Sequence, residues 1–237
     1  MLPGVELSLF NLTITGGRAT DGGSAGAFRG TESAWGGGIL NQGGTLTLRD
    51  VDVVGNTATA TSLIAINGFD VIGNTANGTS GIDAAGGGIY VSDGEGTLDL
   101  NFVLIEGNTA NGRDSGEIPI NAKISILDPV SPIDIGPGGN AFGGGIYVGG
   151  ESGLVKLTNS QVASNQANGG DSNGFFPLPV AVNGVVNGEF FGSGAAQGGG
   201  IYVSGTQLMT EATSFSNNHA NGGFGGGVAE GGAIYHA

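Results

Sequence analysis

A repeat of fixed spacing constrains this chain more than any other feature. Six segments align when one column is formed by Gly17, Asn56, Asn74, Asn108, Asn165 and Asn218. In each segment an aliphatic residue stands ten positions before this column, and an alanine stands two positions after it. A second block, GG(G/A)I(Y/L), contains Ile39, Ile89, Ile146, Ile201 and Ile234. Such repeats are typical of solenoids, in which each unit buries its apolar side chains by stacking on its neighbours.

Apolar residues alternate with polar ones inside each unit, as in TLTLRDVDVV at residues 45–54. A period of two predicts strands. Two short strands joined at a bend, with a third in the GGGIYV block, predict three strands per unit. The shortest spacing between equivalent alanines is 18 residues, from Ala58 to Ala76, which suits one turn of a parallel β-solenoid. We therefore expect an all-β solenoid of about six rungs, formed by residues 1–237 as a single module.

Composition narrows the class of protein further. The 52 glycines follow no Gly-X-Y period, which excludes collagen, and the 38% of hydrophobic residues recur in register, which argues against disorder. A net charge of −14 with six basic residues argues against nucleic acid and anionic lipid as partners. The absence of cysteine excludes disulfides and thiolate metal sites. The sequence also predicts no membrane span and shows no secretion signal at residues 1–10.

The asparagine column has a physical explanation of its own. Asparagine tolerates left-handed backbone geometry, and its side-chain amide can bond the same amide one rung away. We expect these asparagines to be structural corners, with a repeated ligand site as the alternative. The glycine that ends each N-x-A-N-G motif, such as Gly112, is expected to supply a positive φ.

The two repeated motifs resemble those of a known family. The GG(G/A)I(Y/L) blocks and the apolar residues three positions before each asparagine are similar to the repeats of chlamydial-type polymorphic outer-membrane proteins and related autotransporter adhesin passengers. Those apolar residues are Val53, Val71, Ile105, Val162 and Phe215. The resemblance covers the six repeat cores. It implies a right-handed parallel β-helix, located outside the cell or on its surface, that serves as a stalk or adhesive surface without catalytic residues.

Long inserts are predicted at one point of each coil, between the alanine column and the next GGGI block. We expect them at residues 20–35, 79–85, 113–142, 170–197 and 223–230. Loops from one corner emerge on one side of a solenoid, which is commonly the working face. Two inserts are unusually apolar, and one of them contains Phe175, Phe176, Phe190 and Phe191. These phenylalanines are expected either to pack on the flank of the solenoid or to contact another subunit.

The sequence contains one weak cluster of candidate catalytic carboxylates. Asp50 and Asp52 are two residues apart, so both are expected on one face of a strand, with Asp70 one rung away and Arg49 on the opposite face. Polysaccharide lyases and hydrolases need such carboxylates together with a base. Because the sequence offers no catalytic triad, phosphate loop or metal-spaced histidine cluster, we expect no enzyme and no cofactor, with calcium at the three aspartates as an alternative.

The favoured hypothesis is a structural repeat module of an extracellular bacterial surface protein. Its copies are expected to stack head to tail into a filament, sheath or stalk through Leu7, Leu9, Ile234 and Tyr235, because open solenoid ends need covering. The copies are either separate subunits or tandem modules of a longer polypeptide. Six rungs would give an axial repeat of about 29 Å. One alternative is an adhesin fragment whose inserts bind a host surface or carbohydrate. The other is a carbohydrate-active lyase or hydrolase.

Overall fold

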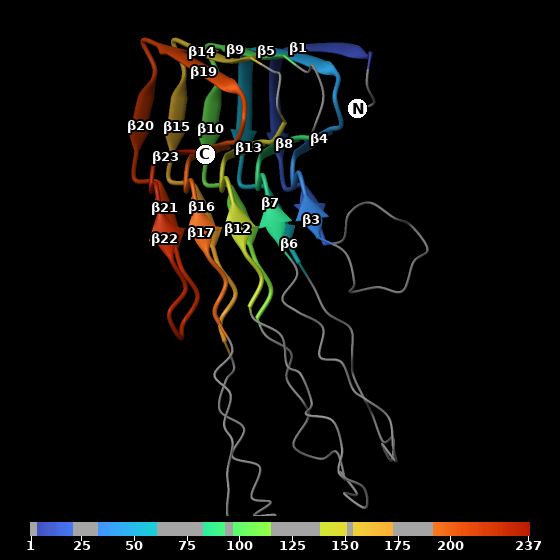
Figure 1. Cartoon of the computed structure of the whole chain (residues 1–237). Helices are drawn as coiled ribbons and strands as arrows, with labels where there is room; N and C mark the ends of the chain where they lie inside the picture. Colours follow the sequence, from blue (N-terminus) through green and yellow to red (C-terminus); the bar gives the residue numbers. More distant parts are fainter. Residues whose placement is uncertain are drawn as a thin grey trace, which may run out of the picture.

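The computed structural model describes residues 4–20, 33–60, 83–92, 97–114, 138–150, 154–172 and 192–237. These residues form a parallel β-solenoid, which confirms the predicted fold class (Figure 1). Every strand pairs in parallel with the equivalent strand of the next rung, so each column of the sequence repeat becomes a column in space. Among the described residues there is no helix.

Four parallel sheets line the solenoid. Sheet A has eight strands, β1 (Glu6–Thr15), β5 (Thr45–Val54), β9 (Thr97–Asn101), β10 (Leu104–Glu106), β14 (Leu154–Thr158), β15 (Gln161–Ala163), β19 (Gln207–Glu211) and β20 (Ser214–Ser216). Sheet B follows it along the chain, with β2 (Arg18–Ala19), β6 (Thr57–Thr59), β11 (Thr109–Asn111), β16 (Gln166–Asn168) and β21 (His219–Asn221).

Sheets C and D complete each coil. Sheet C contains β3 (Ala34–Trp35), β7 (Ala84–Ala85), β12 (Ala141–Phe142), β17 (Ala196–Gln197) and β22 (Ala229–Glu230). Sheet D contains β4 (Ile39–Asn41), β8 (Ile89–Val91), β13 (Ile146–Val148), β18 (Ile201–Val203) and β23 (Ile234–His236). Each strand of sheet C leads through a glycine bend into a strand of sheet D, and sheet D leads into sheet A.

The described solenoid has five rungs in each sheet, one fewer than the approximate number expected from the sequence. Strand β5 pairs directly with β9, placing Leu46 against Leu98, and β6 pairs directly with β11. No rung can therefore stand between them, although the segment with Asn74 itself lies outside the described residues. That segment carries the asparagine motif but has no GGGI block of its own, so it lacks the sequence that forms sheets C and D.

The strands of sheet C occupy the last two residues of each predicted insert, so the predicted inserts were too long. Residues 34–35, 84–85, 141–142, 196–197 and 229–230 belong to the solenoid. The predicted pair of strands joined at a bend is present in sheet A as β9 with β10, β14 with β15 and β19 with β20, and the strands of sheets B and C are additional to the three strands predicted per unit. In every coil, the rest of the predicted insert falls between a strand of sheet B and a strand of sheet C. Strands of two residues are too short to show a period.

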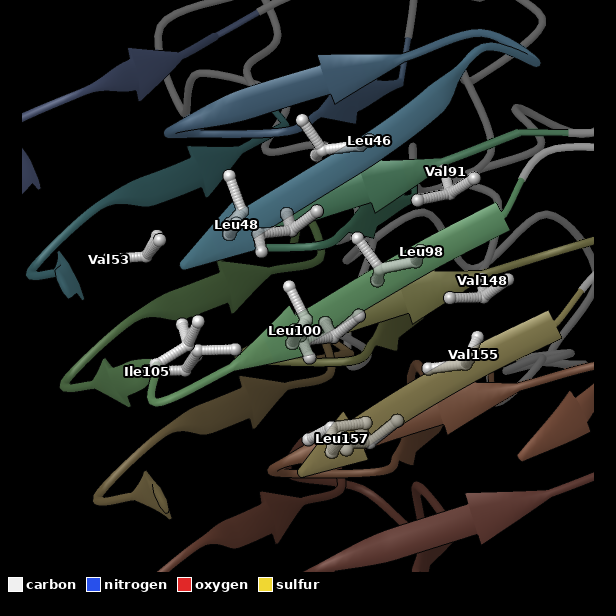
Figure 2. Close-up of a cluster of buried hydrophobic side chains, with 14 of the residues drawn as sticks. Leu46, Leu48, Val53, Val91, Leu98, Leu100, Ile105, Val148, Val155 and Leu157 are labelled. Carbon is white, nitrogen blue, oxygen red and sulfur yellow. The ribbon is translucent and has the colours of Figure 1, made fainter. Parts of the chain in front are cut away.

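Large aliphatic side chains fill the interior between sheets A and D (Figure 2). The predicted inward columns are confirmed, because Val53, Ile105 and Val162 are fully buried and stack in register. Leu46, Leu98 and Val155 form a second buried column. Burying one such side chain contributes roughly 1.5–3 kcal/mol, so these columns supply much of the apolar stabilisation.

Alanine fills the interior between sheets B and C, where a second and separate apolar cluster lies. The coil is narrow here, as predicted from the alanine column. At the boundary between the clusters, the glycine bend meets the backbone of sheet B. A Cβ on Gly87 would lie 2.4 Å from the carbonyl carbon of Thr109, so no larger residue fits without backbone movement. We call this boundary the waist. It separates the wide half of each coil, between sheets A and D, from the narrow half, between sheets B and C.

The asparagine column runs along the waist as a buried ladder. The Nδ2 of Asn56 donates to Oδ1 of Asn108 (3.1 Å), Asn108 donates to Asn165 (3.0 Å), and Asn165 donates to Asn218 (2.9 Å). The backbone N–H of each of the first three asparagines also donates to the next Oδ1. The predicted amide-to-amide contact between rungs is confirmed. In the first unit, the backbone N–H of Gly17 makes the corresponding bond to Asn56 (2.9 Å).

The glycine that ends the N-x-A-N-G motif has a different role from the one predicted. Gly112 is not among the residues with positive φ, and a Cβ there would lie 2.1 Å from the carbonyl oxygen of Gly139 on the returning segment. Close approach of the two segments is therefore what requires glycine. The left-handed residues instead precede the asparagine column, at Gly16, Gly55, Gly107, Ser164 and Asn217.

Candidate functional site

The acidic residues singled out in the sequence do not form a described cluster. Asp52 is exposed, and its neighbours along sheet A are Thr13 and Leu104, neither of which is acidic. Asp70 lies outside the described residues. Among the residues that are described, no group of three His, Cys, Asp or Glu side chains could hold a metal ion. The described geometry therefore brings no third acidic or histidine ligand to Asp50 and Asp52.

Asp50 has a structural position that the sequence pattern concealed. Its φ of 53° places it in a column of left-handed residues that bends sheet A, together with Asn11, Phe102, Asn159 and Ala212. The bend shifts the alternation, so Arg49 and Asp50 are both exposed between the buried Leu48 and Val51. The prediction that Arg49 faces the opposite side was wrong for this reason.

The predicted subunit contacts in the apolar insert, Phe175, Phe176, Phe190 and Phe191, lie outside the described residues. The predicted contacts at the two ends are described. Leu7 and Leu9 lie on β1, and Ile234 and Tyr235 lie on β23. Strand β1 is an edge of sheet A and β23 is an edge of sheet D, so the structure places the two pairs at opposite ends of the solenoid (Figure 1).

Apolar exposure is concentrated at these two ends. Leu7 is 38% exposed, whereas Leu46 at the equivalent place on the next rung is fully buried. Of the eight exposed large hydrophobic residues in the described chain, seven lie on or beside the terminal rungs, and Phe102 is the exception. The seven are Val5, Leu7, Phe10, Leu12, Met209, Phe224 and Val228. Edge strands also present a row of unpaired backbone N–H and C=O groups.

The two ends have complementary outlines. At one end, sheets A and B extend to β1 and β2, while sheets C and D stop one rung short at β3 and β4. At the other end, sheets C and D extend to β22 and β23, one rung beyond β19, β20 and β21 of sheets A and B. Each end is therefore a step of half a coil, and the missing half at one end is present at the other.

A column of stacked aromatic rings runs along the outer surface of sheets C and D. Trp35 stacks on Tyr90 with 5.2 Å between ring centroids, Tyr90 on Tyr147 (4.9 Å), Tyr147 on Tyr202 (5.1 Å) and Tyr202 on Tyr235 (5.4 Å). The planes of each pair are within 15° of parallel. Phe142 packs beside this column, tilted against Tyr202 at 5.1 Å. Such aromatic pairs contribute roughly 0.5–1.5 kcal/mol beyond their area burial.

Polar groups surround the last ring of this column. The Nε2 of Gln197 donates to Oε2 of Glu230 (2.7 Å), and both residues lie on sheet C beside Tyr235. Partial desolvation raises the pKa of the Tyr235 hydroxyl, and the nearby negative charge of Glu230 raises it further. The phenol therefore stays neutral over the physiological pH range and keeps a proton to donate.

A sequence signal marks the strands of sheet C, whose contribution to this surface was not predicted. An alanine stands two residues before every glycine block, in the pattern A-x-G-G-(G/A)-I, and the variable residue x is Trp35, Ala85, Phe142, Gln197 or Glu230. This pattern marks sheet C and places its x residues next to the tyrosine column. The tyrosines of the column recur in the GG(G/A)I(Y/L) block, whereas the contacts of Trp35 and Phe142 with them were not predicted.

Comparison with known proteins gives no further guide to the role of these surfaces. No family model, curated protein or solved structure matches the chain. Within the described residues, no helix has the length and apolar character needed to cross a membrane.

Proposed function

We propose that this chain is a structural module that stacks end to end with further copies, forming a filament, sheath or stalk outside the cell. The observation that carries the proposal is that the first and last described rungs expose core columns and have complementary outlines. Both ends leave core columns partly exposed and parallel strand edges unpaired, and both costs are removed when one end meets the other.

Stacking of this kind is heterologous, since the two faces in contact differ. A heterologous contact whose repetition does not close produces an open filament. Each chain contributes five rungs to every sheet, so a continuous stack advances by about 24 Å per copy at about 4.8 Å per rung. This repeat replaces the value of about 29 Å expected from six rungs.

The bacterial surface location and the likeness to autotransporter passengers remain part of this proposal, as does a role without catalysis. The net charge of −14 supports a well-solvated exterior between the contact faces. The alternative of an adhesin that binds carbohydrate or a host surface through its inserts depends on residues outside the described part of the chain.

The proposal is tested by the size of the purified protein as its concentration rises. We expect growing mass by light scattering, and filaments with an axial repeat of about 24 Å in electron micrographs. Leu9→Lys, which places a charge in the inward column of the terminal rung, should abolish growth. Phe10→Lys is the matched control, because Phe10 is the next residue and is 51% exposed. A protein that stays monomeric at high concentration would contradict the proposal.

A further inference from the structure

Resting on the proposed function, we infer that a second copy of this chain binds by completing one composite coil. Strands β22 and β23 of one copy supply its sheets C and D, and β1 and β2 of the next copy supply its sheets A and B. The half-coil steps at the two ends fit each other in this arrangement and in no other register that keeps all four sheets continuous. This arrangement determines which residues are in contact across the junction between the two copies.

The inward columns of sheet A come into contact across the junction. In the described rungs, Leu7, Leu46, Leu98, Val155 and Leu208 form one continuous column. In the composite coil, Leu208 of one copy lies against Leu7 of the next. Likewise Phe215 lies against Ile14. The core between sheets A and D then continues through the junction with apolar side chains at every position.

At the waist, two residues of the composite coil differ from those of the complete coils, and the two differences compensate for each other. In the four complete coils, a Cβ on the third glycine of the block would lie 3.0 Å from Cγ of the asparagine; these glycines are Gly38, Gly88, Gly145 and Gly200. In the composite coil Ala233 occupies the glycine position, and Gly17 occupies the asparagine position. The extra methyl group of Ala233 thus faces the one unit that has no amide side chain.

The same substitution interrupts the asparagine ladder once per copy. Asn218 accepts two hydrogen bonds from Asn165, and its Nδ2 donates to the carbonyl of Val162 (2.9 Å). Between interior rungs, the backbone N–H and Nδ2 of an asparagine also donate to Oδ1 of the next asparagine. In the next copy this position is held by Gly17, which has no side chain to accept these bonds from Asn218. The junction therefore lacks the amide contact present between interior rungs.

The aromatic column also continues across the junction, and its tryptophan can report the contact between two copies. Each chain has five rungs in sheet D and five rings in the stack, because Trp35 stacks on Tyr90 at the rung where sheet D carries Leu40 instead of a tyrosine. Trp35 is at one end of the stack, and Tyr235 is at the other. In the composite arrangement, Tyr235 stacks on the face of the next copy's Trp35 that is turned away from Tyr90, and the column continues from copy to copy. Trp35 is the single tryptophan of the chain.

The test follows the fluorescence of Trp35 in a mixture of two variants. The reporter chain carries Leu208→Lys, which blocks its sheet A edge at one end and leaves the Trp35 end intact. The silent chain carries Leu9→Lys and Trp35→Phe, so its Tyr235 end alone is available. We expect neither variant to associate by itself, and their mixture to give a 1:1 dimer with a Trp35 emission change that saturates at equal concentrations.

The contact between Tyr235 and Trp35 is tested by a third change in the silent chain. Tyr235→Leu should reduce the Trp35 response to roughly half or less, since the ring contact is lost. Tyr147→Leu, in the same column but away from the junction, is the matched control and should preserve it. Circular dichroism of each variant, with Met209→Lys as an outward-facing control for Leu208→Lys, checks that the coil stays folded.

The outcomes separate this inference from the proposed function. A mixture that forms dimers without a Trp35 response, or with an equal response from Tyr235→Leu, would overturn the composite coil while leaving end-to-end assembly in place. Absence of any concentration-dependent growth of the parent protein would overturn both. If a lysine variant unfolds, the emission of the parent protein and of Tyr235→Leu, followed against concentration beside the mass, gives the same decision.

Discussion

On one side of each coil, sheets A and D enclose leucine, isoleucine and valine, whereas on the other side sheets B and C enclose alanine alone. The wide half is stabilised mainly by apolar area removed from water. The narrow half has little apolar area to bury, and it depends on close backbone approach at glycine and on the asparagine ladder beside it. The comparison shows that one repeat can stack through two different kinds of interaction, separated by the waist.

A change at the ladder is expected to have the largest effect. Asn108→Ala removes the acceptor for the backbone N–H and Nδ2 of Asn56, and it removes the donor to the carbonyl of Val53. Each buried polar group left without a partner costs about 1–3 kcal/mol, so we expect a loss of at least about 3 kcal/mol in the free energy of unfolding, measured by denaturant titration.

The chain offers a matched control for this change. Asn111 lies three residues further along the same rung and belongs to a second amide ladder on the outside of sheet B, where it accepts from Nδ2 of Asn168 (2.8 Å). Because Asn111 is only half-buried, water can replace its contacts. Asn111→Ala should cost about 1 kcal/mol or less. Equal losses from the two variants would show that the buried ladder does not stabilise the waist.

Enlarging the narrow half is expected to have the next largest effect. Ala110 is fully buried between Ala58 and Ala167 of the adjacent rungs, so Ala110→Leu has no space to enter. We expect a loss of about 1–3 kcal/mol or more from overpacking, seen as a lower denaturation midpoint. Ile105→Leu in the wide half keeps the side-chain volume, and it should cost less than about 1.5 kcal/mol. A variant Ala110→Leu that melts like the parent would mean that the alanine side is not tightly packed.

The smallest effect concerns a carboxylate at the entrance to the narrow half. Burial raises the pKa of Asp83 above its usual value of 3.8, although the backbone N–H of Asn140 donates to its Oδ1 (2.7 Å) and partly offsets the shift. The folded protein therefore binds this proton more readily than the unfolded chain. Its contribution to stability is fully present below pH 3.8 and is lost as the pH rises through the folded pKa.

Asp83→Asn should accordingly stabilise the protein at neutral pH, because the amide carries no charge to desolvate. The amide oxygen can still accept from Asn140, just as Oδ1 of Asn140 accepts from the N–H of Ala195 one rung further on (2.9 Å). Urea titrations at neutral and acidic pH measure the difference, which should shrink as the pH falls. A variant that is less stable than the parent at neutral pH would contradict this account.

The sequence by itself determined the columns. Because every rung of a parallel solenoid presents the same position at the same height, the spacing of Leu46, Ile105, Ala110 and Asn108 sufficed to predict which side chains stack, which are buried and where the coil is narrow. It also placed Leu7, Leu9, Ile234 and Tyr235 at the two ends.

Only the tertiary structure decided which segments with the repeat pattern become rungs, and where the coil bends. The pattern recurs at Asn74, outside the described residues, yet β5 pairs directly with β9, because strand pairing depends on residues far apart in sequence. The left-handed φ of Asp50 and Phe102 likewise follows from the bend of sheet A rather than from their residue types. Local spacing encodes what stacks above what. Closure of the coil is a non-local property, which is why the half-coil steps and the contact of Trp35 with the tyrosine column became visible only once the sheets were assembled.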